Sequence, residues 1–386
     1  MYILINLVVL LLKILFSIVK ADNQYSFLLS GSNLEWPSVT EESNDILYGR
    51  YDPRKILVRG IQMDGDRAYV SMPRFMKTGV PWTLGVFHLE FVDFEPDIRP
   101  YPDYNYHMLC NDGRCGNNCL RIVNVVDVFI ESGVLWALDA GTTNVFRKPM
   151  RLGSAQLIGV NLTTDTVIRV TDLSSVTGTD SRLEHVVAMR TRCNRLYVYV
   201  SDAGRHAIVV YNARADRLHS IPLPERVSVA HHRRIALYLM PVNKADKSYV
   251  YFTYRQSGTV YMLDSWSEES VTHGSVTEVG VKPVDMLVLG TDRGTSVYFR
   301  TAGGGNTDIW MWDVNRPLDV CNFVLVHRTY LYLTPIAVVA GWRGLVWSLE
   351  SNYDEYLTDS VDCTGPRTLL RPFKKVVEHC PTDGCR

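Results

Sequence analysis

The chain has 386 residues and a formal net charge of −1, with 21% charged and 46% hydrophobic residues. The balance of acids and bases excludes a nucleic-acid partner held by bulk electrostatic attraction, and the composition is that of a well-packed globular protein. A chain of this length requires either two domains or one large closed β architecture.

The first segment in chain order is an apolar stretch from Tyr2 to Val19, interrupted once by Lys13. The small residues Val19 and Ala21 suit a signal-peptidase site, so residues 1–21 are predicted to be a secretory signal peptide. The alternative is an uncleaved membrane anchor, which Lys13 in the middle of the stretch disfavours. We therefore expect a secreted, extracellular protein.

Six segments further along the chain share one plan, in which a polar or glycine turn leads into an aromatic-rich, alternating strand. They are residues 65–75, 133–141, 194–204, 247–258, 294–304 and 343–352. Their mean spacing of about 56 residues is typical of propellers and solenoids, and four strands with their turns need roughly 40 to 60 residues. The pattern predicts an all-β, six-bladed β-propeller of four-stranded antiparallel blades over residues 22–357, followed by a cysteine-containing tail over 358–386.

Eight cysteines in a secreted chain indicate disulfides, because the compartment is oxidising. The candidates are Cys110, Cys115, Cys119, Cys193, Cys321, Cys363, Cys380 and Cys385, and nothing in the sequence selects their connectivity. The first three resemble half of a zinc site, but no matching pair follows at finger spacing, so no metal site is expected. Asn161-Leu162-Thr163 is an N-glycosylation acceptor, which predicts a glycan on Asn161.

Polar residues stand where the recurring strands end: Arg74, Asp139, Asp202, Arg255, Thr301, Glu350 and Asn352. If the strands are equivalent, these side chains approach one mouth of a central channel from different blades. Acids and amides beside aromatic rings suit a cationic aromatic amine. The predicted ligand-binding residues are Arg74, Asp139, Asp202, Glu350 and Asn352. The alternative is that they form turns and hydrogen bonds between blades.

No strong catalytic pattern is present. The chain has no Gly-x-Ser-x-Gly elbow and no phosphate-binding Gly-x-x-x-x-Gly-Lys loop. We therefore predict no cofactor, and the catalytic residues, if there are any, stay unknown.

Several motifs resemble those of the yellow and major royal jelly protein family. GRYDPRK (49–55) and GVPWTL (79–84) resemble its Gly-Arg-Tyr-x-Pro and Gly-Val-Pro-x-Thr-Leu elements, and PYPDYNYH (100–107), VLWALDAG (134–141) and LVWSLESN (345–352) resemble later elements in the family's order. Ser132 stands where the family has a cysteine, so the chain is identified as a divergent member.

The resemblance implies a secreted six-bladed propeller, with roles that range from cuticle pigmentation, eggshell hardening and nutrition to dopachrome conversion and the binding of aromatic amines in the channel. It also places Asn352 on the family's Ser-Asn segment, where ligand contacts are found. We expect a protein of extracellular matrix formation or pigmentation, in cuticle or eggshell. Its expected partners are matrix components and a small aromatic amine or catechol-type ligand, with no nucleic acid and no membrane.

Two other functions stay open at this point. The first is a dopachrome isomerase, which needs a base that removes a proton from the ring; Asp139, Asp202, Glu350 and His107 are its nominal candidates. The second is a calcium-dependent, lactonase-like propeller, in which acids and amides from separate blades hold a cation on the axis.

Overall fold

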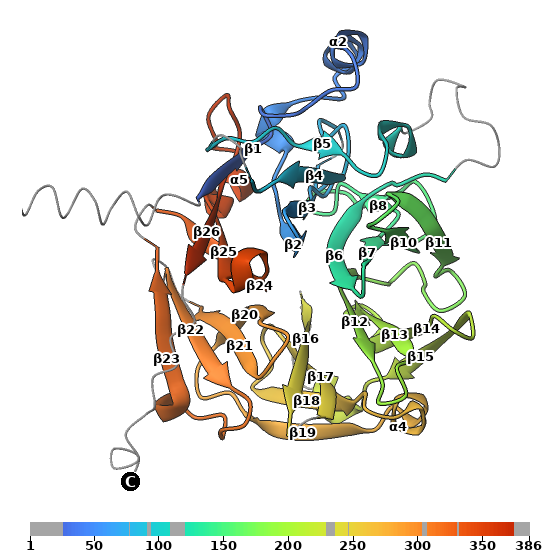
Figure 1. Ribbon diagram of the computed structural model, residues 1–386, viewed down its shortest axis with the longest axis vertical. Coiled ribbons are helices and arrows are strands. Elements are labelled where there is room, and N and C mark those ends of the chain that lie inside the picture. The colour runs from blue at the N-terminus through green and yellow to red at the C-terminus, as the bar shows by residue number, and fades with distance from the viewer. Residues whose placement is uncertain are drawn as a thin grey trace, which may run out of the picture.

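The computed structural model of the protein describes residues 26–76, 78–90, 94–108, 120–228, 236–245, 247–302, 307–329 and 332–373. Six four-stranded antiparallel sheets are arranged as blades around a common axis (Figure 1). Each recurring segment of the sequence contains the second strand of one blade, counted from the axis. The predicted six-bladed propeller is therefore confirmed.

The blades follow one another along the chain, and each is built from the axis outward. Blade 1 contains β2 (Gly60–Asp64), β3 (Arg67–Ser71), β4 (Leu84–His88) and β5 (Arg99–Pro100); blade 2 contains β6 (Val125–Glu131), β7 (Val134–Asp139), β10 (Gln156–Asn161) and β11 (Thr166–Asp172); blade 3 contains β12 (Leu183–Arg190), β13 (Leu196–Asp202), β14 (Ala207–Asn212) and β15 (Arg217–Pro222). Blade 4 contains β16 (Leu237–Lys244), β17 (Lys247–Tyr254), β18 (Thr259–Asp264) and β19 (Val276–Val281); blade 5 contains β20 (Met286–Thr291), β21 (Ser296–Thr301), β22 (Asp308–Asp313) and β23 (Phe323–Arg328); blade 6 contains β24 (Thr334–Ala340), β25 (Val346–Ser351), β26 (Arg367–Phe373) and β1 (Phe27–Ser30).

Position within a blade explains the sequence of each strand. The second strand is covered on both faces by neighbouring blades, so β13 reads as a nearly continuous apolar run and six of its seven residues are buried. The outermost strand of blade 2, β11, instead alternates between exposed and half-buried residues. The aromatic-rich runs are therefore the part of each blade that carries most of the core.

The two ends of the described chain close the ring. β1 pairs with β26 on the outside of blade 6, where Phe27 lies opposite Leu370 and its ring stacks on that of Trp347 at 6.2 Å. The predicted propeller boundary at residue 357 falls short, because β26 belongs to the last blade. The prediction missed this strand because the recurring pattern marks only the second strand of a blade.

Adjacent inner strands pack closely around the axis. β24 contacts both β2 and β20, and β12 contacts both β6 and β16. Gly290 on β20 has a φ of 153°, and a Cβ at this position would lie 2.0 Å from the carbonyl oxygen of Val338 on β24. Only glycine fits this close approach of two backbones.

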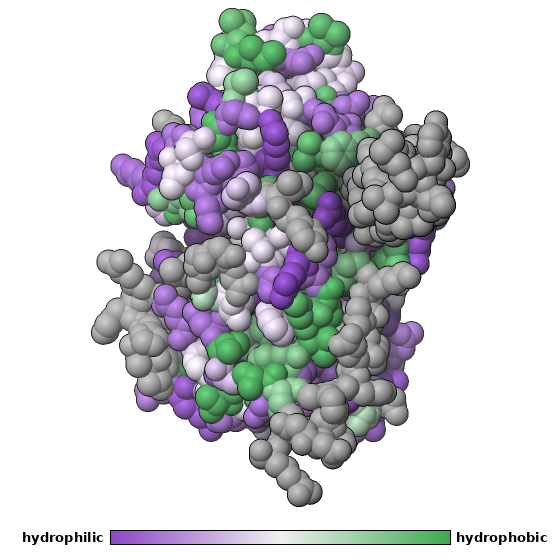
Figure 2. All heavy atoms as spheres, turned by 90° about the vertical axis from the view of Figure 1, so that its left-hand side faces the viewer, coloured by the Kyte–Doolittle hydropathy of each residue, from purple (hydrophilic) through white to green (hydrophobic). Residues whose placement is uncertain are grey.

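The remaining elements lie between or outside the blades. They are the hairpin of β8 (Thr142–Thr143) and β9 (Met150–Arg151), the helices α2 (Val39–Leu47), α3 (Glu225–Ser228), α4 (Glu268–His273) and α5 (Tyr353–Leu357), and the 3-10 turns η1 (Pro53–Lys55), η2 (Tyr104–His107), η3 (Val320–Asn322) and η4 (Trp342–Gly344). Helix α2 projects from the ring and exposes the hydrophobic side chains of Val39, Ile46 and Leu47 at the top of Figure 2. Within the described ranges, no helix has the length and apolar character needed to cross a membrane.

Candidate ligand-binding site at one end of the propeller axis

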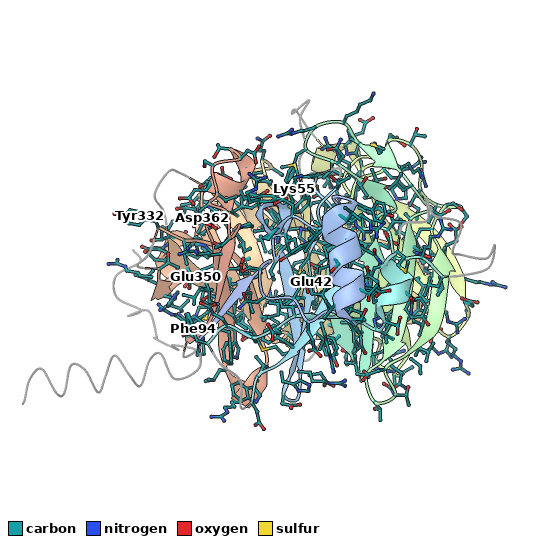
Figure 3. All side chains as sticks on the ribbon, turned by 90° about the horizontal axis from the view of Figure 1, so that it is seen from above. Glu42, Lys55, Phe94, Tyr332, Glu350 and Asp362 are labelled. Atoms are coloured by element: carbon teal, nitrogen blue, oxygen red, sulfur yellow. The ribbon has the colours of Figure 1, made fainter. Side chains whose placement is uncertain are left out.

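In every blade, the first residue of the inner strand lies beside the last residue of the second strand. Both residues therefore lie at the same end of the propeller axis. In blade 4, Leu237 at the start of β16 pairs with Tyr254 at the end of β17, and in blade 5 Met286 pairs with Thr301. Figure 3 shows Lys55 and Asp362 toward this face of the ring and Phe94 toward the opposite face. Polar residues at these strand ends therefore meet around one end of the axis.

Seven such residues from five blades form what we call the axial cluster, and all seven are half-buried. They are Arg59 before β2, Glu184 and His185 on β12, Tyr238 on β16, Arg255 after β17, Arg300 on β21 and Tyr353 on α5. Their charges act on one another across the ring: the pKa of Tyr238 responds to Arg59, Arg255, Arg300 and Glu184. The cluster thus joins blades that are not neighbours in the sequence.

The three arginines of the axial cluster form no ion pair with any acidic side chain among the described residues. Within the described ranges, Arg255 and Arg300 form no ion pair, and the guanidinium of Arg59 donates only to the carbonyl oxygen of Ile336, at 3.5 Å. Burial lowers the pKa of Arg300, and the neighbouring charges of Arg255 and Arg59 lower it further. Like charges held together in this way favour the approach of an anion.

Glu184 is the acid of the axial cluster. Its Oε2 atom is buried and has no hydrogen-bond partner in the part of the chain that the structure describes. Burial raises the pKa of this carboxyl, while the charges of His185, Arg59 and Arg182 oppose the shift. A carboxyl with a raised pKa and a vacant acceptor atom takes up a proton at a higher pH than an ordinary glutamate does.

Three aromatic rings belong to the axial cluster, those of His185, Tyr238 and Tyr353. The rings of His185 and Tyr238 lie 5.3 Å apart and are inclined by 38°, and His185 Nδ1 lies 3.5 Å from Asp127 Oδ2. Burial raises the pKa of Tyr238 and of Tyr353, so both phenols stay neutral. They offer ring faces and hydroxyl groups to a small aromatic molecule.

The opposite end of the axis is occupied by Arg293 from the turn between β20 and β21. Its guanidinium carbon lies 4.6 Å from the ring centroid of Phe129 on β6, and it donates a short hydrogen bond to Gln62 Oε1 on β2. Blade 5 thereby contacts blades 1 and 2 across the ring. The axial cluster and Arg293 lie at opposite ends of the inner strands.

Arg74, a predicted ligand-binding residue, is buried between blades 1 and 2. Its guanidinium donates to five backbone carbonyl oxygens, those of Val80, Pro81, His107, Ile122 and Val123. Burial lowers its pKa to about 10. The side chain therefore organises the loops between the two blades.

Asp139 and Asp202 occupy equivalent places at the ends of β7 and β13 and are fully buried. Asp139 accepts from the amides of Val123 and Asn124 at 2.7 Å, from that of Gly141 at 2.9 Å and from Gln156 Nε2 at 3.0 Å. Asp202 accepts from Ser181 Oγ and from the amides of Arg182 and Arg205. Each carboxylate thus holds the loop that leads into its own blade.

The other strand-end candidates also bond to the protein itself. Glu350, buried within blade 6, accepts from His327 Nε2 at 2.8 Å and from Ser348 Oγ at 2.6 Å. Asn352 Oδ1 accepts from the Arg367 amide at 2.8 Å. None of the five predicted ligand-binding residues belongs to the axial cluster, so their part in ligand binding stays a prediction.

His107, a nominal base, is buried against the Tyr101 carbonyl oxygen, at 2.9 Å, and burial lowers its pKa to about 3. Arg255 is the one residue of the predicted strand-end set that lies in the axial cluster. The sequence analysis missed Arg59, Glu184, His185, Tyr238, Arg300 and Tyr353. In each blade the inner strand directly precedes the recurring strand in the chain. The segment before each recurring strand therefore contained the signal for Glu184, His185 and Tyr238, which lie near the starts of inner strands.

The remaining predicted sites are only partly covered by the structure. Among the described residues, no group of three or more His, Cys, Asp or Glu could hold a metal ion. Cys193 and Cys363 are exposed free thiols, and Cys321 is described as well, whereas Cys110, Cys115, Cys119, Cys380 and Cys385 lie outside the described residues. The predicted signal peptide, residues 1–21, lies outside them too. Disulfide pairing therefore stays a prediction.

The predicted glycosylation site lies in a surface turn. Asn161 ends β10, and its Oδ1 accepts from the amides of Thr163 and Thr164. The turn holds the acceptor sequence at the outer side of blade 2. Glycosylation of Asn161 stays a prediction.

Fold and site together define a six-bladed β-propeller with a polar, aromatic and cationic cluster at one end of its axis. The family described as major royal jelly protein matches residues 123–368, which cover blades 2 to 5 and the two inner strands of blade 6. The chain belongs to this family, as the sequence motifs indicated.

Curated relatives are similar at modest identity. The protein yellow of Drosophila melanogaster is 27% identical over 197 residues, which cover 50% of this chain and 35% of that protein. A dopaminechrome tautomerase of Drosophila melanogaster is 24% identical over 185 residues, which cover 47% of this chain and 39% of that protein. The chain thus spans less than half the length of each. Among solved structures, a calcium-binding protein, regucalcin, from Agrobacterium tumefaciens matches with a TM-score of 0.48 and 11% identity over 83% of this chain and 92% of that chain.

Proposed function

We propose that the protein is a secreted yellow-family propeller that acts in pigmentation or in the formation of an extracellular matrix such as cuticle or eggshell. In this proposal the axial cluster binds a small, catechol-derived aromatic molecule. The proposal is supported by family membership, by the apolar N-terminal segment and by sequence similarity to the protein yellow of Drosophila melanogaster.

The observation that carries the proposal is the convergence of half-buried rings and unsatisfied polar groups from five blades. Structural polar residues such as Asp139 have all their partners within the protein. The axial cluster instead combines the rings of Tyr238 and His185 with a carboxylate oxygen that has no partner in the described ranges. Ligand sites commonly join apolar surface to a few such convergent polar groups.

Calorimetric titration of the purified protein with catechol, dopamine and 5-hydroxyindole tests this proposal. We expect at least one of them to bind, and Tyr238→Leu to weaken that binding about tenfold, because aromatic contacts contribute about 0.5–1.5 kcal/mol beyond buried area. Tyr332→Leu is the matched control, because this tyrosine is fully exposed (Figure 3). Equal loss in both variants would contradict a site at the axis.

A second candidate is an isomerase of the dopachrome type, which the vacant acceptor atom of Glu184 favours. In such a tautomerisation a ring C–H bond breaks, its proton passes to the carboxylate, and the electron pair moves through the ring until a quinone oxygen is protonated. No oxidant is consumed, and the arginines would stabilise charge that develops on oxygen. If the protein catalyses this step, dopachrome absorbance decays faster in its presence and Glu184→Gln abolishes the effect, whereas Glu278→Gln, at an exposed position of β19, preserves it.

A further inference from the structure

We infer that the ligand of the axial cluster carries an anionic group, a carboxylate on an aromatic ring, that lies against Arg255 and Arg300 while the ring contacts Tyr238. This inference rests on the proposed ligand-binding function and narrows its chemistry. It differs from the expectation of a cationic amine drawn from the strand-end acids, because those acids bond to the protein itself.

The first argument is a comparison with other arginines of the molecule. Two other half-buried arginines have acid partners: Arg67 lies 2.9 Å from Asp165, and Arg195 forms a short ion pair with Glu268. Buried Arg74 is surrounded by carbonyl oxygens. Arg255 and Arg300 have neither kind of partner among the described residues. Withdrawing a guanidinium from water without a partner costs free energy, which a bound anion would recover.

The second argument is the balance of charge. Three guanidinium groups face one carboxylate, that of Glu184, and the charge of exposed Asp354 also acts on Arg300. The arginines repel one another, so a single negative charge relieves the repulsion, whereas an ammonium group would add to it. A guanidinium group can donate two parallel hydrogen bonds to one carboxylate. A carboxylate therefore suits these arginines better than a neutral ligand group that carries only a partial charge.

The third argument is the aromatic surface beside these charges. Tyr238 contacts the ring of His185, and the strand register pairs its neighbour Leu237 with Tyr254, the residue before Arg255, so the ring and this guanidinium belong to the same end of blade 4. A planar aromatic carboxylate would satisfy both kinds of surface, whereas an aliphatic anion would leave the ring faces without a partner.

Calorimetric titration of the full chain with three related probes tests the inference. The probes are 5-hydroxyindole-2-carboxylate, 5-hydroxyindole without the carboxylate, and serotonin with an ammonium group. We expect the carboxylate to bind about tenfold or more tightly than the other two. Arg255→Gln and Arg300→Gln should each weaken the binding of the carboxylate probe about tenfold, because each variant loses one charge-assisted hydrogen bond. Neither variant should change the affinity for 5-hydroxyindole.

Controls separate binding from folding. Arg217→Gln, an exposed position on outer strand β15, should bind all probes as the wild type does. Arg300→Gln removes one of the three arginine charges that repel one another, so its melting temperature should equal or exceed that of the wild type. Weaker binding by this variant would then not reflect unfolding. If 5-hydroxyindole or serotonin binds as tightly as the carboxylate, the inference is overturned and the proposed function stands. If no probe binds, the inference is overturned, and the proposed ligand site falls with it when catechol and dopamine also fail to bind.

Discussion

Arg293, in the turn between β20 and β21, holds its guanidinium carbon 4.6 Å from the ring centroid of Phe129 on β6, so this one contact joins blades 5 and 2. The same guanidinium donates to Gln62 of blade 1. Burial lowers the pKa of Arg293, while the charges of Glu131 and Asp64 oppose the shift. The side chain is thus a brace between blades at the end of the axis away from the axial cluster.

Arg293→Met should lower the free energy of unfolding by about 1–3 kcal/mol, because it removes the cation–π contact and leaves Gln62 Oε1 without its donor. Arg293→Lys keeps the charge and should fall between the wild type and the methionine variant. Urea unfolding measures both. Arg217→Met, at an exposed position, should change stability by no more than about 0.5 kcal/mol. A methionine variant as stable as the wild type would contradict the role as a brace.

Asp139→Asn tests whether the strand-end carboxylates hold loops. The carboxylate accepts four hydrogen bonds, and an amide NH₂ in its place would face backbone N–H donors. We expect a loss of about 2–4 kcal/mol in unfolding free energy, with ligand affinity of the folded fraction unchanged. Chemical denaturation and calorimetry measure the two quantities. A variant that loses affinity at full stability would instead make Asp139 a ligand contact.

The fold could be predicted because one strand in each blade is buried on both faces. Strands such as β13 and β25 must be dense in apolar and aromatic residues, so their spacing shows the number of blades. The outer strand β1 could not be predicted from FLLS, since a four-residue run gains its meaning only from pairing with β26, which lies more than 300 residues later in the chain. Local pattern cannot report such a pairing.

The candidate site was harder to predict than the fold. Strand-end side chains were expected around one mouth of the channel, and of that set Arg255 belongs to the axial cluster. Asp139 turns back to bind amides of its own blade, which no periodicity reveals. Glu184 and Tyr238 lie on inner strands, whose mixed sequences resemble loops until their register with the second strand is known. Predicting the site therefore requires the register of the strands, whereas predicting the fold requires only the composition and spacing of the recurring strands.

Closure of the ring by β1 can be tested at its most buried residue. Leu29 is fully buried against blade 6, so Leu29→Ala should lower the unfolding free energy by about 2–5 kcal/mol through lost burial and a cavity. Val39→Ala is a matched truncation on helix α2, where the side chain is 78% exposed, and it should change stability by about 0.5 kcal/mol or less. Thermal unfolding measures both. Equal effects would mean that β1 adds little to closure.

Glu184→Gln tests whether burial or the nearby cations control the acid of the axial cluster. The pKa of Glu184 is raised above its ordinary value of 4.5, chiefly by burial, against the charges of His185, Arg59 and Arg182. The folded protein therefore holds a proton at pH values where the unfolded chain has released it. The corresponding stability is present below pH 4.5 and is lost as the pH rises through the raised pKa.

Glutamine resembles the neutral carboxyl, so Glu184→Gln should match the wild-type melting temperature at about pH 4 and exceed it at about pH 7.5. Glu278→Gln, at an exposed position of β19, should track the wild type at both pH values. A glutamine variant that melts below the wild type at the higher pH would show that attraction to Arg59 and His185 outweighs burial. Glu184 would then be a fixed anion that neutralises part of the arginine charge, and its use as a proton acceptor would lose its physical basis.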